Sequence, residues 1–130
     1  MRTIRKYIVV DDDPTNNEIC NIMLEMVLGK VDIRTFQVPE EGLAFIQKEY
    51  SKTLKPAILL LDINMPTLTG WQFMEYYKKF PETVKKQISI YILSSSVDKR
   101  DKDKAKANQG IKGFISKPLD QKTILSIAGA

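Results

Sequence analysis

Residues 57–62 have the sequence AILLLD, in which five apolar residues are followed directly by Asp62. A strand this apolar must be buried on both faces, so we expect it at the centre of a parallel sheet that helices cover on both sides. In such sheets, ligands bind in the crevice outside the carboxyl ends of the strands. The position of Asp62 therefore predicts a charged site at that edge of the sheet.

Three other apolar segments also end in side chains that can do chemistry. They are Tyr7–Val10, followed by Asp11-Asp12-Asp13; Ile90–Leu93, followed by Ser94-Ser95-Ser96; and Gly113–Ser116, followed by Lys117-Pro118. Because the carboxyl ends of parallel strands meet at one edge, we expect these carboxylates, hydroxyls and one ammonium to converge there. Such a group of side chains can hold a divalent cation and a phosphoryl group.

Strand and helix patterns alternate along the chain, which is typical of a doubly wound α/β fold with a parallel sheet. The expected strands are Lys6–Val10, Asp32–Phe36, Ala57–Leu61, Ile88–Leu93 and Lys112–Ile115. The expected helices begin at Pro14, at Pro39 and after Gly70, and two more span about Asp98–Asn108 and Gln121–Ala128. We expect one domain over residues 1–130 without an effector domain, since the chain ends where the last helix ends.

The first expected helix has cues at both ends. Asp13 is a suitable cap ahead of Pro14, and Gly29 is a typical terminator. Apolar side chains recur between them at helical spacing, namely Ile19, Ile22, Met23, Met26 and Val27. Cys20 lies on the apolar side of this helix, so we expect it to be a buried small hydrophobe.

The composition excludes several classes of protein. Hydrophobic residues make up 43% of the chain, too much for a disordered protein. No apolar run reaches the roughly 18 residues that span a bilayer, so we expect no membrane contact. With no histidine and one cysteine, zinc sites, haem sites and internal disulfides are excluded, and any metal must be a hard cation on oxygen ligands. These features favour a cytoplasmic protein.

The net charge of +4 does not by itself indicate a nucleic-acid partner, because the basic residues are dispersed. The densest basic stretch, Asp98–Lys106, interleaves aspartates with lysines and one arginine, a pattern typical of a solvated helix face. No helix-turn-helix pair follows it, and no basic run is interleaved with aromatic residues. We therefore expect no nucleic-acid partner.

The aspartates at the strand ends predict a bound cation and a phosphoryl-transfer reaction. Two carboxylates about 4 Å apart repel by roughly 4 kcal/mol at an effective dielectric near 20, so Asp11, Asp12 and Asp62 need a cation. Mg²⁺ suits them because it takes one or two carboxylates and leaves room for phosphate oxygens. An ionised Asp62 can accept a phosphoryl group to form an acyl phosphate. Lys117 supplies a positive charge for the phosphoryl oxygens, and Ser94 supplies a hydroxyl donor.

Each of these residues also has a purely structural explanation. Asp13 is explained better as a helix cap than as a ligand, and Asp11 with Asp12 can be loop acids. Ser94–Ser96 and Lys117-Pro118 can be plain turns. No turn explains a charge at the end of a central strand, and the joint occurrence at four strand ends favours the functional interpretation.

These motifs closely resemble the receiver domain of two-component response regulators, in its single-domain, chemotaxis-regulator-like form. The resemblance rests on Val9-Val10-Asp11-Asp12, on Leu61-Asp62-Ile63-Asn64-Met65-Pro66 with Gly70, on Ser94, and on Lys117-Pro118. It covers the chain from Lys6 onward. It implies a flavodoxin-like sheet of strand order 2-1-3-4-5 with five helices, and phosphoryl transfer from a histidine kinase or phosphotransfer protein. It also implies a signalling domain that catalyses only its own phosphorylation and dephosphorylation.

The resemblance further implies a role for individual residues. Asp62 would be the phosphoacceptor. Asp12, Asp62 and the Asn64 carbonyl would bind Mg²⁺ directly, and Asp11 would bind it through water. Ser94 and Lys117 would contact the phosphoryl oxygens, and the bond before Pro118 would be cis.

Phe114 falls at the switch-aromatic position of the family, where many members have tyrosine. The switched surface would comprise the helix over Asp98–Asn108 together with the strand and helix that follow it. A separate output protein, or a second copy of the chain, would bind that surface.

Two alternatives stay open at this point. Asp11, Asp13 and Thr15 fit the first motif of haloacid-dehalogenase-like phosphatases, with Asp11 as nucleophile and Asp13 as acid/base. No late acidic pair supplies the fourth motif of that family, and Asp62 would have no role. The other alternative is a phosphorylation-independent interaction module on the same scaffold, against which the intact acids, Ser94 and Lys117 argue.

Overall fold

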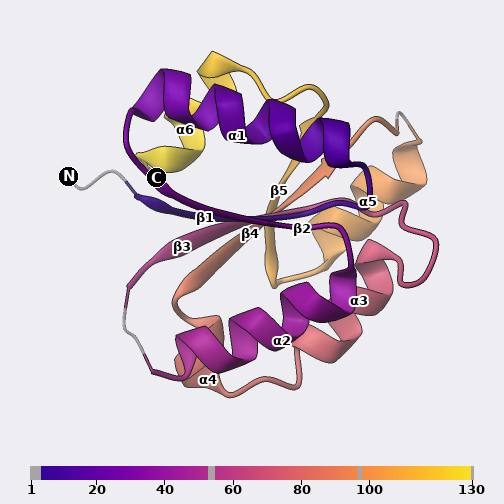
Figure 1. Ribbon diagram of the computed structural model, residues 1–130. Helices are drawn as coiled ribbons and strands as arrows, with labels where there is room; N and C mark the ends of the chain where they lie inside the picture. The colour runs from indigo at the N-terminus through magenta and orange to yellow at the C-terminus, as the bar shows by residue number, and fades with distance from the viewer. Residues whose placement is uncertain (1–3, 53–54, 97, 130) are drawn as a thin grey trace.

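The computed structural model describes residues 4–52, 55–96 and 98–129 (Figure 1). Within these residues, five parallel strands form one sheet in the order β2-β1-β3-β4-β5. The strands are β1 (Lys6–Val10), β2 (Asp32–Phe36), β3 (Ala57–Leu61), β4 (Ile88–Ser94) and β5 (Ile111–Ser116). The helices are α1 (Pro14–Leu28), α2 (Pro39–Tyr50), α3 (Gly70–Tyr77), α4 (Glu82–Lys85), α5 (Lys99–Ala107) and α6 (Gln121–Ala128). The predicted fold class and strand order are confirmed.

Helices cover both faces of the sheet, as Figure 1 shows. Helices α1 and α6 lie on one face, and α2, α3 and α4 lie on the other, where Ala105 of α5 also joins the core. Strand β3 is fully buried at the centre, and its side chains alternate between the two cores. Ile58 and Leu60 pack toward α1 and α6, whereas Leu59 and Leu61 pack toward α2 and α3. This double burial explains the absence of polar residues from the strand.

The structure has six helices in the described ranges, whereas five were predicted. The additional helix, α4, is a single turn of four residues that follows Pro81. A segment this short cannot show a helical period in the sequence, so the pattern gave no signal. The other elements lie within one or two residues of the bounds that were predicted for them, although no end was predicted for α2 or α3.

Helix α1 confirms the predicted caps but not a fully buried apolar face. The Asp13 carboxylate accepts a hydrogen bond from the Thr15 amide at 3.0 Å, and Gly29 ends the helix with φ of 80°. Cys20 is buried, as predicted. Of the apolar set, Ile19, Ile22 and Met26 are 38%, 46% and 74% exposed, because the buried face of the helix is Asn16, Asn17, Cys20 and Leu24.

The predicted domain over residues 1–130 includes residues 1–3 and 130, which lie outside the described residues. None of the helices that the structure describes is both long and apolar enough to cross a lipid bilayer.

Candidate functional site

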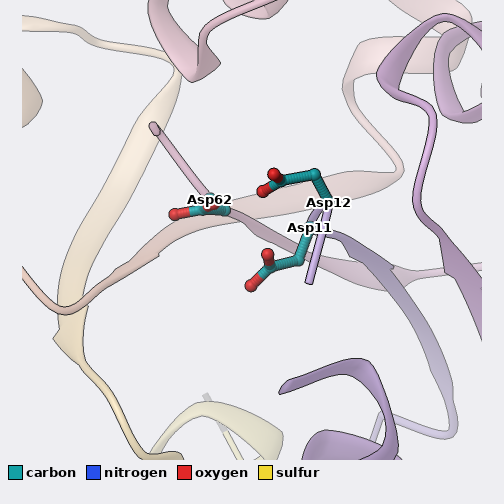
Figure 2. Close-up of side chains that lie close together, drawn as sticks. All are labelled: Asp11, Asp12 and Asp62. Atoms are coloured by element: carbon teal, nitrogen blue, oxygen red, sulfur yellow. The ribbon is translucent and has the colours of Figure 1, made fainter. Parts of the chain in front are cut away.

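The parallel pairing of β1 with β3 brings two acidic segments together. Val10 pairs with Leu61 in the sheet, so Asp11 and Asp62 leave adjacent strands at the same level, and the Asp62 amide donates to the Val10 carbonyl at 2.9 Å. Carboxylate oxygens of Asp11, Asp12 and Asp62 lie within 4.8 Å of one another. Figure 2 shows the three carboxylates pointing to the same side of this edge. The sheet register therefore creates the acidic cluster that the sequence predicted.

Lys117 reaches this cluster from the end of β5. Its amide donates to the Ser94 carbonyl at 2.9 Å, which ties the Lys117 segment to the end of β4. Its ammonium Nζ lies 2.8 Å from Asp11 Oδ2 and 3.6 Å from Asp62 Oδ1. The Lys117 side chain is 18% exposed and both carboxylates are buried, so this pair is only weakly screened by water. The peptide bond between Lys117 and Pro118 is cis, as predicted.

Two asparagines that the sequence analysis did not single out hold Asp11 in place. Asn16 Nδ2 donates to Asp11 Oδ2 at 2.7 Å, and Asn17 Nδ2 donates to the Asp11 carbonyl at 2.9 Å. The Asp13 amide donates to Asp11 Oδ1 at 2.9 Å. Both carboxylate oxygens of Asp11 are thus engaged. The available signal was two adjacent polar residues in the first turn of a helix that directly follows the acids.

The electrostatics of the cluster leave it short of positive charge. Burial, and then the charge of Asp11, raise the pKa of Asp62 to about 6, although Lys117 and the Asn64 backbone partly offset this. Burial lowers the pKa of Lys117, but its hydrogen bond to Asp11 and the negative charge of Asp11 and Asp62 outweigh burial, so that pKa is raised. Of the three carboxylates, Asp11 and Asp62 pair with the Lys117 ammonium, and Asp12 forms no ion pair with any residue that the structure describes. The donor set fits a hard divalent cation with oxygen ligands.

The loop after Asp62 is held against the site by Gly70. The Gly70 amide donates to the Ile63 carbonyl at 3.1 Å. A Cβ atom at this position would lie 2.7 Å from both the Asp62 carbonyl oxygen and the Ile63 Cα. Only glycine allows the loop to return this closely to the strand end, which keeps Asn64 next to Asp62.

Ser94 ends β4 at the same edge of the sheet and is buried. Its hydroxyl Oγ accepts a hydrogen bond from the Ser96 amide at 3.0 Å. Phe114 lies inside β5, opposite Ile92, and not at the end of the strand. It is half-buried. Lys102 of α5 places its ammonium 6.0 Å from the centre of the Phe114 ring. Ser94 therefore lies with the acids and Lys117 at the edge, while Phe114 lies within β5 and beside Lys102 of α5.

The family description "response regulator receiver domain" matches residues 7–128. The chain belongs to the response regulator receiver domain family. It is 30% identical over 125 residues to protein PilH of Pseudomonas aeruginosa, and the match covers 96% of this chain and 95% of PilH. Among solved structures, it resembles a two-component response regulator from Cytophaga hutchinsonii, with a TM-score of 0.90, 26% identity and coverage of 98% and 96% of the two chains.

Other relatives show how widely the receiver domain is used. The chemotaxis protein CheY4 of Vibrio cholerae has the same fold, with a TM-score of 0.74, 24% identity and coverage of 95% of each chain. The DNA-binding transcriptional activator EvgA of Escherichia coli is 28% identical over 119 residues, which span 92% of this chain but 53% of EvgA. Receiver domains are signalling domains that work in phosphorelays through an aspartate, bind Mg²⁺ at an acidic pocket, and interact with histidine kinases or phosphotransfer proteins and with output partners.

Proposed function

We propose that this receiver domain accepts a phosphoryl group on Asp62 from a histidine kinase or phosphotransfer protein and passes the signal to the surface of α5, β5 and α6. The observation that carries the proposal is the arrangement of charges at the strand ends. Carboxylate oxygens of Asp11, Asp12 and Asp62 lie within 4.8 Å of one another, and the half-buried Lys117 ammonium pairs with both Asp11 and Asp62. The reaction is phosphoryl transfer to a carboxylate, and the domain acts on no separate substrate.

Asp62 is suited to be the nucleophile. Its pKa of about 6 leaves the carboxylate mostly ionised at neutral pH, even without a metal. A carboxylate oxygen of Asp62 forms a bond to phosphorus as the bond from phosphorus to the donor imidazole nitrogen breaks. The electron pair of that bond stays on the nitrogen, and a proton on the other ring nitrogen makes the leaving group a neutral imidazole. Lys117, already 3.6 Å from Asp62 Oδ1, is placed to stabilise the negative charge of the phosphoryl oxygens.

Asp12, Asp62 and the Asn64 carbonyl would hold Mg²⁺, and Asp11 would contact it through water. The surplus of carboxylates over ammonium groups supports this assignment. A bound Mg²⁺ would supply positive charge that reduces the repulsion among the carboxylates and neutralises phosphoryl oxygens.

Asp11 is poorly suited to the nucleophilic role that a phosphatase of the haloacid-dehalogenase type would require. Its two oxygens accept hydrogen bonds from the Asp13 amide and the Asn16 amide group, and one also pairs with Lys117. These contacts lower the nucleophilicity of the Asp11 carboxylate and fix its position. Asp13 caps α1 through the Thr15 amide, so it is committed to a structural contact and not to acid/base chemistry.

A chain of hydrogen bonds supports the proposed output route. Ser94 Oγ accepts from the Ser96 amide, and Ser96 Oγ donates to Asp101 Oδ2 on α5 at 2.8 Å. A phosphoryl group on Asp62 would offer the Ser94 hydroxyl a strong acceptor and draw it away from Ser96. That movement would loosen the connection to α5 and let Phe114 turn inward. A separate output protein or a second copy of the chain would then bind the altered surface.

The phosphoacceptor is tested by labelling the protein with acetyl phosphate and Mg²⁺, followed by borohydride trapping and mass spectrometry. We expect a single acyl phosphate at Asp62, and we expect Asp62→Asn to abolish it. Asp13→Asn is the matched control, because it removes a neighbouring carboxylate that only caps α1, and it should label normally. Label at Asp11, or undiminished label in the Asp62→Asn protein, would overturn the proposal.

The output route is tested by comparing amide chemical shifts with and without beryllofluoride and Mg²⁺, a mimic of the acyl phosphate. We expect shifts in the acidic site, at Phe114 and along α5. In Ser96→Ala the shifts of the acidic site should persist while those of α5 shrink. Ser95→Ala is the control, because Ser95 is exposed. Shifts confined to the acidic site in the unmodified protein would favour the constitutive interaction module instead.

A further inference from the structure

A second cavity lies at the opposite edge of the sheet from the acidic site. Its volume is about 930 Å³, and it is formed by the carboxyl ends of α3 and α5, by α4, and by the first residues of β4 and β5. No residue of the acidic site lines it. This volume falls in the range of roughly 300–1,000 Å³ that is typical of small-molecule sites.

Lysines give the cavity a surplus of positive charge. Of the five that line it, Lys78 pairs with Glu75 at 2.8 Å and Lys85 pairs with Glu82 at 3.1 Å. The other three, Lys86, Lys104 and Lys112, form no ion pair with any residue that the structure describes. They come from three different elements or their ends and so do not follow one helix face, and Lys104 also places its ammonium 5.4 Å from the centre of the Trp71 ring. Their arrangement favours an anionic ligand.

Tyr77 carries an unused hydrogen-bond donor in the buried wall of the same cavity. It lines the cavity, its residue is only 4% exposed, and its hydroxyl finds no hydrogen-bond partner among the described residues. Burial, and then the charge of Glu82, raise the pKa of this phenol, so it remains a neutral donor at physiological pH. A buried hydroxyl without an acceptor is unusual in a native protein, and a ligand oxygen or an ordered water would satisfy it.

The remaining lining combines apolar and polar side chains. Met74 and Ile88 offer apolar surface, and Ser89 and Asn108 offer hydrogen-bonding groups. A ligand that matches all of these features has a phosphate group for the lysines and the Tyr77 hydroxyl, and a less charged organic part for Met74 and Ile88. An extended acidic peptide matches less well, because the Tyr77 donor is buried and a peptide backbone that lies across the opening would not reach it.

We propose that this cavity binds a phosphate-bearing small molecule of nucleotide size, with Lys86 and Lys112 contacting the phosphate oxygens and the Tyr77 hydroxyl donating to one of them. The inference is independent of the proposed phosphoacceptor function, because the two sites share no residue. A phosphorylated metabolite bound here would contact α5 and β5, which also belong to the proposed output surface.

The test is a titration with ATP and with inorganic pyrophosphate in buffer that contains EDTA, so that the acidic site cannot recruit the ligand through a metal. Amide chemical shifts locate binding, and calorimetry measures affinity. We expect shifts at the end of α3, at α4 and at the start of β4, with none at Asp62. Adenosine, which lacks phosphate, should bind at least tenfold more weakly than ATP.

Variants distinguish the contributions of the Tyr77 hydroxyl and of the cavity lysines to ATP affinity from a general effect of charge. Tyr77→Phe should weaken ATP binding about tenfold, as expected for a lost hydrogen bond to a charged group, without loss of stability. Lys86→Gln combined with Lys112→Gln should weaken it further. The matched controls are Tyr76→Phe and Lys79→Gln, which alter the neighbouring pair outside the cavity and should leave affinity unchanged.

Three results would overturn the proposal. They are equal affinity for ATP and adenosine, equal losses in the cavity and control variants, or shifts at this site with a polyglutamate peptide but not with ATP. The last result would assign the cavity to an acidic protein segment. Labelling of Asp62 by acetyl phosphate should be unchanged in Tyr77→Phe, so failure of either proposal is distinguishable from failure of the other.

Discussion

The acidic site and the basic cavity occupy opposite edges of one sheet, and they are built in different ways. The acidic site takes its charges from the ends of β1, β3 and β5, and hydrogen bonds or ion pairs fix Asp11 and Lys117. The basic cavity takes its charges mainly from helix ends, and four of its five lysines are exposed. The sheet register fixes the positions of residues at strand ends. An exposed side chain on a helix surface can still adopt several rotamers.

The difference explains why the acidic site is sensitive to small structural changes and the basic cavity should tolerate them. In the acidic site the Lys117 ammonium lies against two buried carboxylates, so removing it leaves both of their charges uncompensated. In the basic cavity the lysines keep much of their hydration, so each contributes mainly to ligand affinity. The predictions below test this contrast, from the largest expected effect to the smallest.

The largest difference in stability between the two edges is expected when a glycine at each edge is replaced by alanine. At Gly70, a Cβ would come within 2.7 Å of backbone atoms that cannot move aside, so Gly70→Ala should lower the free energy of unfolding by about 3 kcal/mol. At Gly110, beside the basic cavity, a Cβ would meet the ends of two side chains, Asn108 Oδ1 at 3.2 Å and Met74 Cε at 3.3 Å. Gly110→Ala should therefore cost less than about 1 kcal/mol. Urea denaturation measures both, and equal losses would contradict the contrast.

Removing a lysine should have a large effect only at the acidic edge. Lys117→Met leaves the buried Asp11 and Asp62 carboxylates facing each other, and should lower the free energy of unfolding by about 2 kcal/mol in metal-free buffer. Mg²⁺ should restore part of this loss. Lys112→Met at the cavity should change stability by less than about 0.5 kcal/mol, because its side chain is exposed. A Lys117→Met protein as stable as the unmodified one would show that the ion pair is dispensable.

The raised pKa of Asp62 predicts a pH dependence of stability in metal-free buffer. The folded protein holds its proton more tightly than the unfolded chain, whose pKa is the ordinary 3.8, so stability falls as pH rises from about 4 to about 6 and then levels off. Asp62→Asn removes this loss and should raise the free energy of unfolding at pH 7 by about 1 to 3 kcal/mol, since one pKa unit corresponds to about 1.4 kcal/mol. Denaturation curves at pH 5 and pH 7.5 measure the difference between the two proteins. A gain in the free energy of unfolding from Asp62→Asn that is larger at pH 5 than at pH 7.5 would contradict a raised pKa of Asp62.

The smallest effect is expected at the unpartnered hydroxyl of the basic cavity. Tyr77→Phe removes no hydrogen bond within the described residues, so stability should change by less than about 0.5 kcal/mol. Tyr7→Phe is the comparison, because the Tyr7 hydroxyl donates to the Ile4 carbonyl at 2.8 Å and its loss should cost about 1 kcal/mol. Thermal denaturation of the two variants measures the difference. A larger loss in Tyr77→Phe would mean that its hydroxyl has a partner in solution.

Much of the fold could be predicted because its signals are local. The AILLLD segment at residues 57–62 required a central strand, and Asp13 with Pro14 marked the start of α1. The same local signals failed where the tertiary environment decides which helix face is buried or whether a short helix forms. The spacing of Ile19, Ile22 and Met26 indicated a helix but not which side of it is buried, and the single turn of α4 was too short to leave a pattern.

By itself, the sequence determined which residues end the strands and therefore which chemical groups lie at the carboxyl edge, since side-chain order along a strand is fixed by covalent geometry. Only the tertiary structure decided how those groups interact. The pairing of β1 with β3 sets the spacing of Asp11 and Asp62, burial raises the pKa of Asp62, and Asn16 becomes a partner of Asp11. The basic cavity likewise exists only after folding, because it joins α3, α4 and α5 to the start of β4 and β5. Distances between segments remote in sequence depend on packing, and no local pattern encodes them.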